Sequence, residues 1–260
     1  MITLRSRDEL VKLEEASRIV LETLDAVEKA VAPGVTTDEL DRIAEAAIRS
    51  RGARPAFVGY RGFPRTLCTS INDEVVHGIP GRRKLKEGDV VGVDCGAVVE
   101  GYFGDAARTF PVGHIDAQKA RLLTATRRAL DAGIAAARPG GRVSDIGAAV
   151  EEVALVHGYG VVRDFVGHGV GTALHEEPQV PNYGPAGRGS LLKAGMVIAI
   201  EPMFNIGRAE VSVDPDGWTV RTRDKSASAH FEYTVAIAPQ GAVILGLGRL
   251  ASARAAAVGA

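Results

Sequence analysis

The sequence contains 260 residues, of which 46% are hydrophobic and 24% charged, and its 31 basic and 32 acidic side chains leave a formal net charge of −1. This is the composition of an ordinary globular protein, long enough for one large domain or two small ones, with no basic excess that would point to specific DNA binding. The N-terminal residues lack the apolar core of a signal peptide, and no run approaches the roughly 20 apolar residues of a membrane span. We therefore expect a cytoplasmic protein with no membrane partner.

Two helices are predicted at the N-terminal end. Residues 6–9, Ser-Arg-Asp-Glu, form a capping box, and apolar residues follow at helical spacing until Pro33-Gly34. A second helix is predicted from about Thr37 to Ser50, because five apolar residues recur there on one face. These residues are Leu40, Ile43, Ala44, Ala47 and Ile48.

Two strands that carry one aspartate each are predicted next. Period-two alternation over residues 90–98 places Asp94 on the face opposite the row of aliphatic side chains. A second strand over residues 102–110 carries Asp105, after a turn centred on Glu100 and either of its neighbours. Both positions of the turn leave the two aspartates on one face, within about 5 to 8 Å. Carboxylates this close repel unless a cation lies between them.

The second half of the chain repeats this order. A helix is predicted from about Asp116 to Arg138, and another from Ser144 to about His157. The segment around the first Pro-Gly stop, residues 32–40, resembles residues 138–146. Two apolar strands then carry one acid each, Glu201 in residues 196–204 and Glu232 in residues 229–236.

This repetition predicts an α+β fold built from two duplicated halves of about 110 residues. We expect the halves to pack about a pseudo-twofold axis, with their strands merging into one curved antiparallel sheet. We expect residues 1–250 to form a single domain and residues 251–260 to form a disordered tail.

Five residues of metal-binding type lie within strand-like or glycine-flanked apolar stretches. They are Asp94, Asp105, His168, Glu201 and Glu232. The wet face of a half-exposed strand would explain any one of these acids, but a shared pair of divalent ions would explain all five residues together. The two cysteines, Cys68 and Cys95, have no CxxC spacing and are expected to be reduced, so oxygen and imidazole would hold the metal. Such a site is typical of a hydrolase.

Two further histidines lie beside turns, one in each half: His77 and His175. An imidazole at such a place would donate a hydrogen bond to a scissile carbonyl or to the tetrahedral intermediate. The alternative is that each is a loop histidine with a structural hydrogen bond. His230 shares a face with Glu232, and we expect it to lie beside the metal ligands.

The motifs around these residues resemble those of bacterial type I methionine aminopeptidases, members of peptidase family M24. They are VDCGA at 93–97, GDAARTF at 104–110, GHGVG at 167–171, HEEP at 175–178, IEPM at 200–203 and FEYT at 231–234. The resemblance implies the pita-bread fold and removal of the initiator methionine of nascent polypeptides when the second residue is small. It also implies two divalent ions, with cobalt, manganese, iron(II) and zinc all compatible with the donors.

The resemblance also implies a role for each residue. Asp94 and Asp105 would hold one ion and Asp105, His168 and Glu201 the other, with Glu232 bridging the two. A metal-activated water would attack the scissile amide. Glu201 would move the proton from this water to the leaving amine, while His77 and His175 position the amide.

Five residues match the family's methionine pocket, namely Tyr60, Phe63, Cys68, Leu174 and Trp218. Three positions depart from its usual pattern: Phe63 stands where tyrosine is common, Leu174 where an aromatic residue often lies, and Phe57 where a small residue or cysteine is common. Asn72 and Ser228 match positions that bind a monovalent cation in relatives.

Two alternatives remain open at this point. One is a proline-specific aminopeptidase or dipeptidase of the same fold, although we expect none of the additional N-terminal domain that those enzymes carry. The other is a non-catalytic binding protein on this fold, which would be expected to lose ligands. We expect a monomer. The basic run at residues 82–86 would suit transient contact with the ribosome, although a solvated turn explains it as well.

Overall fold

The computed structural model describes residues 2–248 and 250. Its helices are α1 (Arg7–Glu28), α2 (Thr37–Ser50), α3 (Ala117–Ala136) and α4 (Val143–His157), with a short 3-10 helix, η1 (Tyr60–Gly62). The strands of the N-terminal half are β1 (Arg54–Pro55), β2 (Leu67–Ile71), β3 (Glu74–Val76), β4 (Val90–Val99) and β5 (Tyr102–Pro111). Those of the C-terminal half are β6 (Gly160–Val161), β7 (Gly167–Gly169), β8 (Glu176–Val180), β9 (Val197–Ile200), β10 (Met203–Asn205), β11 (Val211–Val213), β12 (Val220–Thr222), β13 (Ser228–His230), β14 (Glu232–Ala238) and β15 (Gly241–Ile244). The expected disordered tail, 251–260, lies outside the described residues.

The predicted helices are present, and their ends follow the capping residues. Ser6 and Glu9 form the expected capping box of α1, and Thr36 forms a second one with Glu39 at α2. Asp116 caps α3 by accepting a hydrogen bond from Lys119 N. Within the described residues, no helix is both long enough and apolar enough to cross a membrane.

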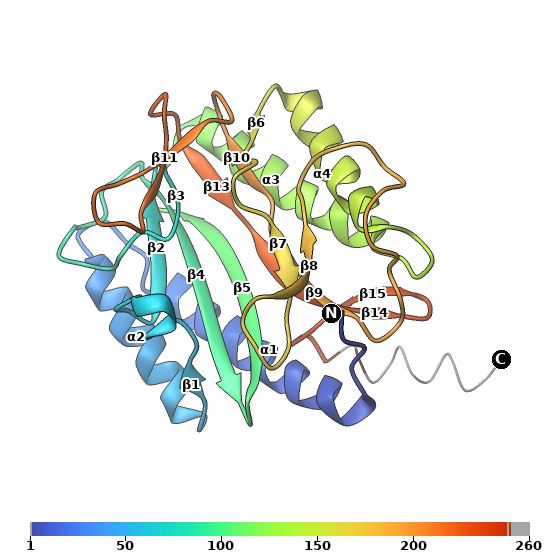
Figure 1. The fold of residues 1–260 in the computed structure, drawn as a ribbon. Coiled ribbons are helices and arrows are strands. Elements are labelled where there is room, and N and C mark those ends of the chain that lie inside the picture. Colours follow the sequence, from blue (N-terminus) through green and yellow to red (C-terminus); the bar gives the residue numbers. More distant parts are fainter. Residues whose placement is uncertain (1, 249, 251–260) are drawn as a thin grey trace.

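The two halves of the chain join in one large sheet. Its strand order is β1-β4-β5-β14-β9-β7-β8, with β2 paired to β4 and β15 paired to β14. The strands from β1 to β5 come from the first half and the others from the second, so the halves meet where β5 pairs with β14 (Figure 1). The α-α-β-β order occurs in both halves, as the repeated sequence pattern predicted.

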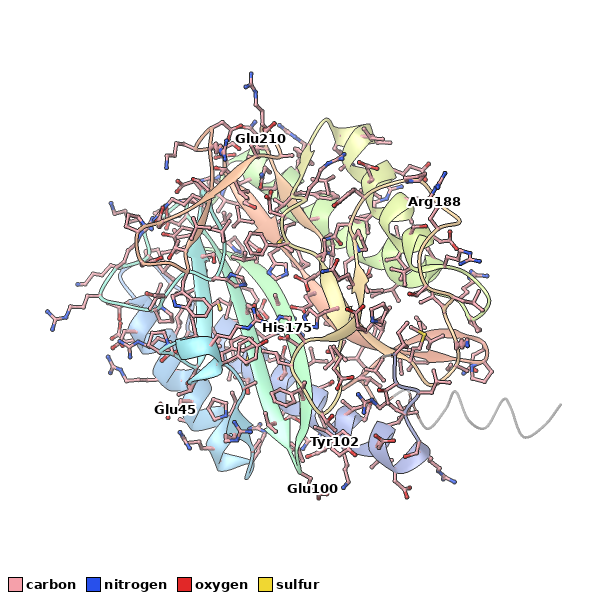
Figure 2. The ribbon with its side chains drawn as sticks, viewed as in Figure 1. Glu45, Glu100, Tyr102, His175, Arg188 and Glu210 are labelled. Atoms are coloured by element: carbon pink, nitrogen blue, oxygen red, sulfur yellow. The ribbon has the colours of Figure 1, made fainter. Side chains whose placement is uncertain are left out.

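The helices pack on one face of this sheet and leave the other face for the site. Helix α1 packs on β4 and β5, and α3 packs on β9 and β14. The approach of α1 is close, since a Cβ on Gly104 would lie 2.5 Å from Ser17 N. Val91, Val93 and Cys95 join the helices in the main hydrophobic core. On the opposite face, His175 lies near the middle of the view in Figure 2.

The β4–β5 hairpin confirms the predicted placement of its two aspartates. Its turn is centred on Glu100 and Gly101, which both have positive φ, 49° and 84°. Asp94 pairs with Ala107 and Asp105 with Gly96, so the aspartates are diagonal neighbours on one face.

The prediction of two unbroken strands around Glu201 and Glu232 was wrong. The first is divided into β9 and β10 at Glu201-Pro202, and the second into β13 and β14 at Phe231. Proline has no N–H to donate to a ladder, and here the chain leaves the large sheet for a smaller one in which β10 pairs with β13. Phe231 N donates to Pro202 O at 3.3 Å, so the two breaks face each other. Both glutamates therefore lie at the point where the sheets diverge.

Candidate metal centre and substrate pocket

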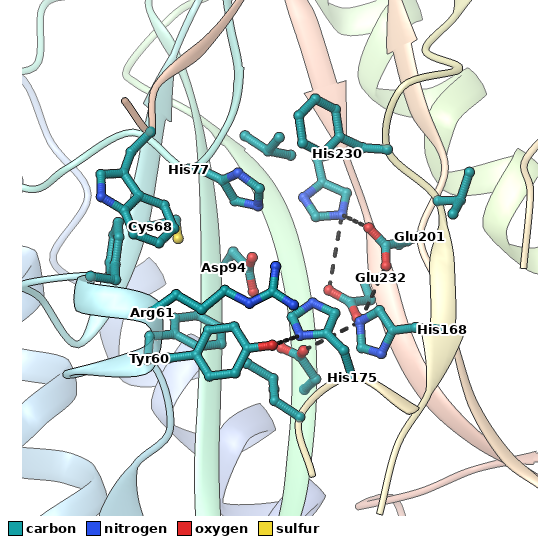
Figure 3. Close-up of a pocket in the computed structure, with 18 of the residues that line it drawn as sticks. Tyr60, Arg61, Cys68, His77, Asp94, His168, His175, Glu201, His230 and Glu232 are labelled. Atoms are coloured by element: carbon teal, nitrogen blue, oxygen red, sulfur yellow. Dashed lines mark hydrogen bonds and ion pairs between the residues drawn. The ribbon is translucent and has the colours of Figure 1, made fainter. Parts of the chain in front are cut away.

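The five predicted ligands converge from five different strand segments. Asp94 comes from β4, Asp105 from β5 and His168 from β7, while Glu201 follows β9 and Glu232 begins β14. Figure 3 shows Asp94, His168, Glu201 and Glu232 around one space. One ligand atom each from Asp105, His168 and Glu232 lies within 4.8 Å of the other two. The fold therefore brings together all of the predicted ligands.

The orientation of His168 suits a metal ligand. Its Nδ1 lies 2.9 Å from Gly169 O, and because a carbonyl oxygen only accepts, Nδ1 carries the proton. The lone pair of Nε2 then faces the carboxylates, 3.5 Å from Glu201 Oε1 and 3.9 Å from Asp105 Oδ2. Burial lowers the pKa of His168, which favours the neutral form that binds metal.

Within the described part of the chain, no lysine or arginine forms an ion pair with the carboxylates of the cluster. Burial raises the pKa of Asp94 to about 7. Burial first, and then the charge of neighbouring carboxylates, raises the pKa of Asp105, Glu201 and Glu232 well above the ordinary values. Asp94 Oδ1, Asp105 Oδ1 and Glu232 Oε1 are buried without any hydrogen-bond partner among the described residues. Burying a carboxylate oxygen without a hydrogen-bond partner is costly, and a bound cation would compensate for that cost.

His230 lies against the cluster, as expected. Its Nε2 is 3.9 Å from Glu201 Oε2 and 3.9 Å from Glu232 Oε2. Burial lowers the pKa of His230 to about 3, so the ring is neutral. Its backbone is fixed by Thr109 on β5, whose hydroxyl accepts from His230 N at 2.9 Å and donates to His230 O at 2.8 Å.

His77 and His175 line the same cavity from opposite halves of the chain (Figure 3). Burial lowers the pKa of His77 to about 4 and that of His175 to about 3, so both are neutral near pH 7. Tyr60 Oη lies 2.8 Å from His175 Nδ1, and the two rings stack with centroids 5.3 Å apart. When the hydroxyl donates to Nδ1, Nε2 carries the proton and is a hydrogen-bond donor.

An apolar pocket lies beside the carboxylates within a cavity of about 300 Å³. The predicted pocket residues Tyr60, Phe63, Cys68, Leu174 and Trp218 all line it, as does Phe57. Phe63 and Trp218 meet edge to face at 5.1 Å. Burial raises the pKa of the Cys68 thiol, which therefore stays neutral. The pocket is suited to an uncharged side chain.

Some residues that line the cavity were not predicted, among them Arg61, Asp164 and Phe165. Phe165 packs edge to face on His77 at 5.3 Å. Its position two residues before Gly167 was a signal, since it precedes a predicted ligand motif. Arg61 has a positive φ of 48° within η1, a conformation that the surrounding glycines suggested only weakly.

The remaining predicted residues lie away from the cavity. Ser228 N donates to Asn72 O at 2.8 Å, so the structure brings this pair together. The Asn72 side chain also donates a hydrogen bond from Nδ2 to Asp89 Oδ1 at 2.7 Å, and its Oδ1 accepts one from Val90 N at 3.1 Å. The monovalent cation stays a prediction. In the basic run, Arg83 pairs with Glu74 at 2.8 Å.

Comparison with known proteins identifies the family. The model of metallopeptidase family M24 matches residues 11–239. The chain belongs to metallopeptidase family M24. A methionine aminopeptidase of Clostridium acetobutylicum is 50% identical over 248 residues, which cover 95% of this chain and 99% of that protein.

Solved structures of the family confirm the pita-bread fold. The crystal structure of a methionine aminopeptidase from Rickettsia prowazekii matches with a TM-score of 0.93 at 42% identity, covering 95% of this chain and 100% of the other. A prolidase from Pyrococcus furiosus matches with a TM-score of 0.75 at 26% identity, covering 94% of this chain but 65% of the prolidase. The resemblance to methionine aminopeptidases is thus confirmed, and the proline-specific alternative is not favoured.

Proposed function

We propose that this member of family M24 is a methionine aminopeptidase that hydrolyses the first peptide bond of polypeptides beginning with methionine. The observation that carries this proposal is that a cluster of metal-binding side chains and an apolar pocket share one cavity. Four clustered carboxylates and an imidazole lie directly beside an apolar pocket that would hold one uncharged side chain, and three of these carboxylates have a buried oxygen without a hydrogen-bond partner among the described residues. The 50% identity to a methionine aminopeptidase over nearly the whole chain supports the same substrate.

The donor set fits two divalent ions. Asp94 and Asp105 would hold one, His168 and Glu201 together with Asp105 the other, and Glu232 would bridge them. Oxygen and neutral imidazole donors suit manganese, iron(II), cobalt or zinc. When bound, such ions acidify a water molecule and polarise a carbonyl oxygen. The orphaned oxygens of Asp94, Asp105 and Glu232 support this assignment.

Glu201 is suited to move the proton during hydrolysis. It lies at the break between β9 and β10, where Asn182 Nδ2 fixes its backbone carbonyl at 3.0 Å. Its side chain faces both His168 and His230. We propose that the Glu201 carboxylate takes a proton from the attacking water and passes it to the leaving amine.

His77 and His175 would hold the scissile amide. Both imidazoles are neutral and face the cavity, so each can donate one N–H to a carbonyl oxygen. A donor fixed before the reaction stabilises the charge that develops on this oxygen in the transition state. The hydrogen bond from Tyr60 to Nδ1 would keep the His175 proton on Nε2.

We also propose the substrate preference and setting expected from the sequence. The methionine side chain would lie among Tyr60, Phe63, Cys68, Leu174 and Trp218, and small second residues would be preferred. The substrate would be a new polypeptide in the cytoplasm. Ribosome contact, the monomeric state and the cellular metal stay predictions.

Release of the N-terminal residue from synthetic peptides tests this function. Protein stripped with a chelator would receive manganese, iron(II), cobalt or zinc singly, and Met-Ala-Ser, Met-Leu-Ser and Leu-Pro would be compared. We expect methionine release from Met-Ala-Ser only. Cleavage of Leu-Pro would instead favour a proline-specific peptidase, and no cleavage with any metal would favour a binding protein. Asp131→Asn, on the exposed face of α3, is the matched control for Asp94→Asn, which should be inactive.

A further inference from the structure

A buried ion pair lies behind the loop that carries His175. The Arg5 guanidinium, in the segment before α1, pairs with Glu176 Oε2, and its side chain is 5% exposed. Arg5 also donates to Glu9 Oε1 at 3.2 Å. Nothing in the proposed reaction uses these residues, yet Glu176 directly follows His175 in the chain.

Glu176 organises the loop from within. Its Oε1 accepts hydrogen bonds from Thr172 N at 2.8 Å and Ala173 N at 3.1 Å. Gly171 N in turn donates to Ala173 O at 3.1 Å. One carboxylate therefore folds residues 171–176 into a tight turn and fixes the backbone on both sides of Leu174 and His175.

Arg5 connects this turn to the rigid part of the molecule. Its backbone N donates to Gly195 O at 2.8 Å, just before β9. Its partner Glu9 belongs to the capping box of α1 and accepts from Ser6 N at 2.9 Å. A Cβ on Gly171 would overlap the Arg5 guanidinium, so the loop backbone rests directly on this cation.

The cavity side of His175 is held by side chains. Tyr60 bonds its Nδ1, and the ring of His168 lies 4.2 Å away between centroids. These contacts orient the ring, and the backbone that follows it is held where Glu176 pairs with Gly169 of β7. Arg5 and Glu176 supply the complementary restraint on the backbone.

We propose that Arg5 and Glu176 are positioning residues for His175. The inference rests on the role proposed above for His175 and extends it to an ion pair whose two residues are 171 positions apart in the sequence. Removing one partner of a buried pair leaves the other charge uncompensated, and Glu176 would then turn toward water and release the turn. His175 Nε2 would lose its fixed distance to the scissile carbonyl.

Kinetics of a double-mutant cycle test this inference. Arg5→Met, His175→Ala and the double variant would be loaded with metal and assayed on Met-Ala-Ser. We expect Arg5→Met to lower kcat roughly 10- to 100-fold, the cost of a misplaced catalytic group. In the His175→Ala background the same change should lower kcat less than about twofold, because the two residues act as one unit. Arg5→Lys should recover part of the loss.

Controls separate positioning from folding. Arg18→Met removes an arginine of α1 whose pairs with Glu15 and Glu22 are partly exposed, and it should keep wild-type kcat. Thermal unfolding and metal content would be measured for each variant. If Arg5→Met does not fold, Glu176→Gln removes the charge but retains an acceptor for the turn, and it enters the same cycle.

The outcomes are distinct. An Arg5→Met effect that persists in full in the His175→Ala background, or no effect on kcat, would overturn the inference alone. If His175→Ala keeps wild-type kcat while methionine is still released, the proposed role of His175 is wrong and the inference falls with it. Absence of methionine release by the wild-type protein would contradict the proposed function itself.

Discussion

Replacing one carboxylate of the candidate metal centre should make the metal-free protein more stable. Asp94 has a buried oxygen without a hydrogen-bond partner, and burial raises its pKa from 3.8 to about 7. Asp94→Asn keeps the shape of the side chain and removes its charge. The variant should therefore lose metal binding and gain stability when both proteins are stripped of metal, a trade-off common at functional sites.

The size of this gain in stability follows from the difference in the pKa of Asp94 between the folded and unfolded states. A tenfold change in proton affinity corresponds to ~1.4 kcal/mol, so ionised Asp94 costs the metal-free fold up to about 4 kcal/mol at pH 8. The amide of asparagine carries its own cost of burial, which leaves a net gain of about 1 to 3 kcal/mol. The gain should be smallest at pH 4, close to the pKa of this carboxyl in the unfolded state, grow as the pH rises from 4 to 7, and level off above pH 7, where the carboxyl is ionised in both states.

Urea unfolding of chelator-treated wild type and Asp94→Asn between pH 4 and pH 8 measures this difference. Asp131→Asn is the control, because its side chain on α3 is 61% exposed and its charge is solvated. Equal or lower stability of Asp94→Asn at pH 8, or a gain that is the same at every pH, would refute the electrostatic argument.

Three further predictions concern single contacts. Asp41 Oδ1 accepts hydrogen bonds from two buried backbone N–H groups at the start of β2, at 2.9 and 2.8 Å. Asp41→Ala should therefore lower the unfolding free energy, measured in urea, by about 2 to 5 kcal/mol. Asp41→Asn should lower it by less than half of that amount. Tyr60→Phe removes the hydrogen bond to His175, and kcat on Met-Ala-Ser should fall about fivefold with unchanged thermal stability. Gly104→Ala places a Cβ against the backbone of α1 at Ser17 and should cost about 1 to 3 kcal/mol of unfolding free energy in urea; unchanged stability would mean that the helix shifts freely.

Local sequence signals predicted the elements that local chemistry determines. The capping residues Ser6 and Asp116 gave the starts of α1 and α3 to within a residue. Side-chain parity in the β4–β5 hairpin placed Asp94 and Asp105 on one face although the centre of the turn was open. Such features depend on contacts between residues close in the chain.

Features that depend on distant pairing were not predictable in the same way. The divided strands at Glu201 and Glu232 look continuous in sequence, and only Pro202 hinted at a break. The distances within the ligand cluster depend on the pairing of β5 with β14, whose partners are more than a hundred residues apart in sequence. Arg5 and Glu176 carry no local signal of their contact, since each resembles an ordinary surface charge until the fold buries Arg5 and covers most of Glu176.

We propose that the five clustered ligands form one dinuclear metal site that carries peptide hydrolysis. Calorimetric titration of the metal-free protein with manganese, with methionine release from Met-Ala-Ser followed in parallel, would test this claim. We expect up to two ions to bind per chain, activity to rise with occupancy, and Asp94→Asn to lose both. Methionine release from protein that holds no metal, or full metal binding and activity in Asp94→Asn, would contradict the claim.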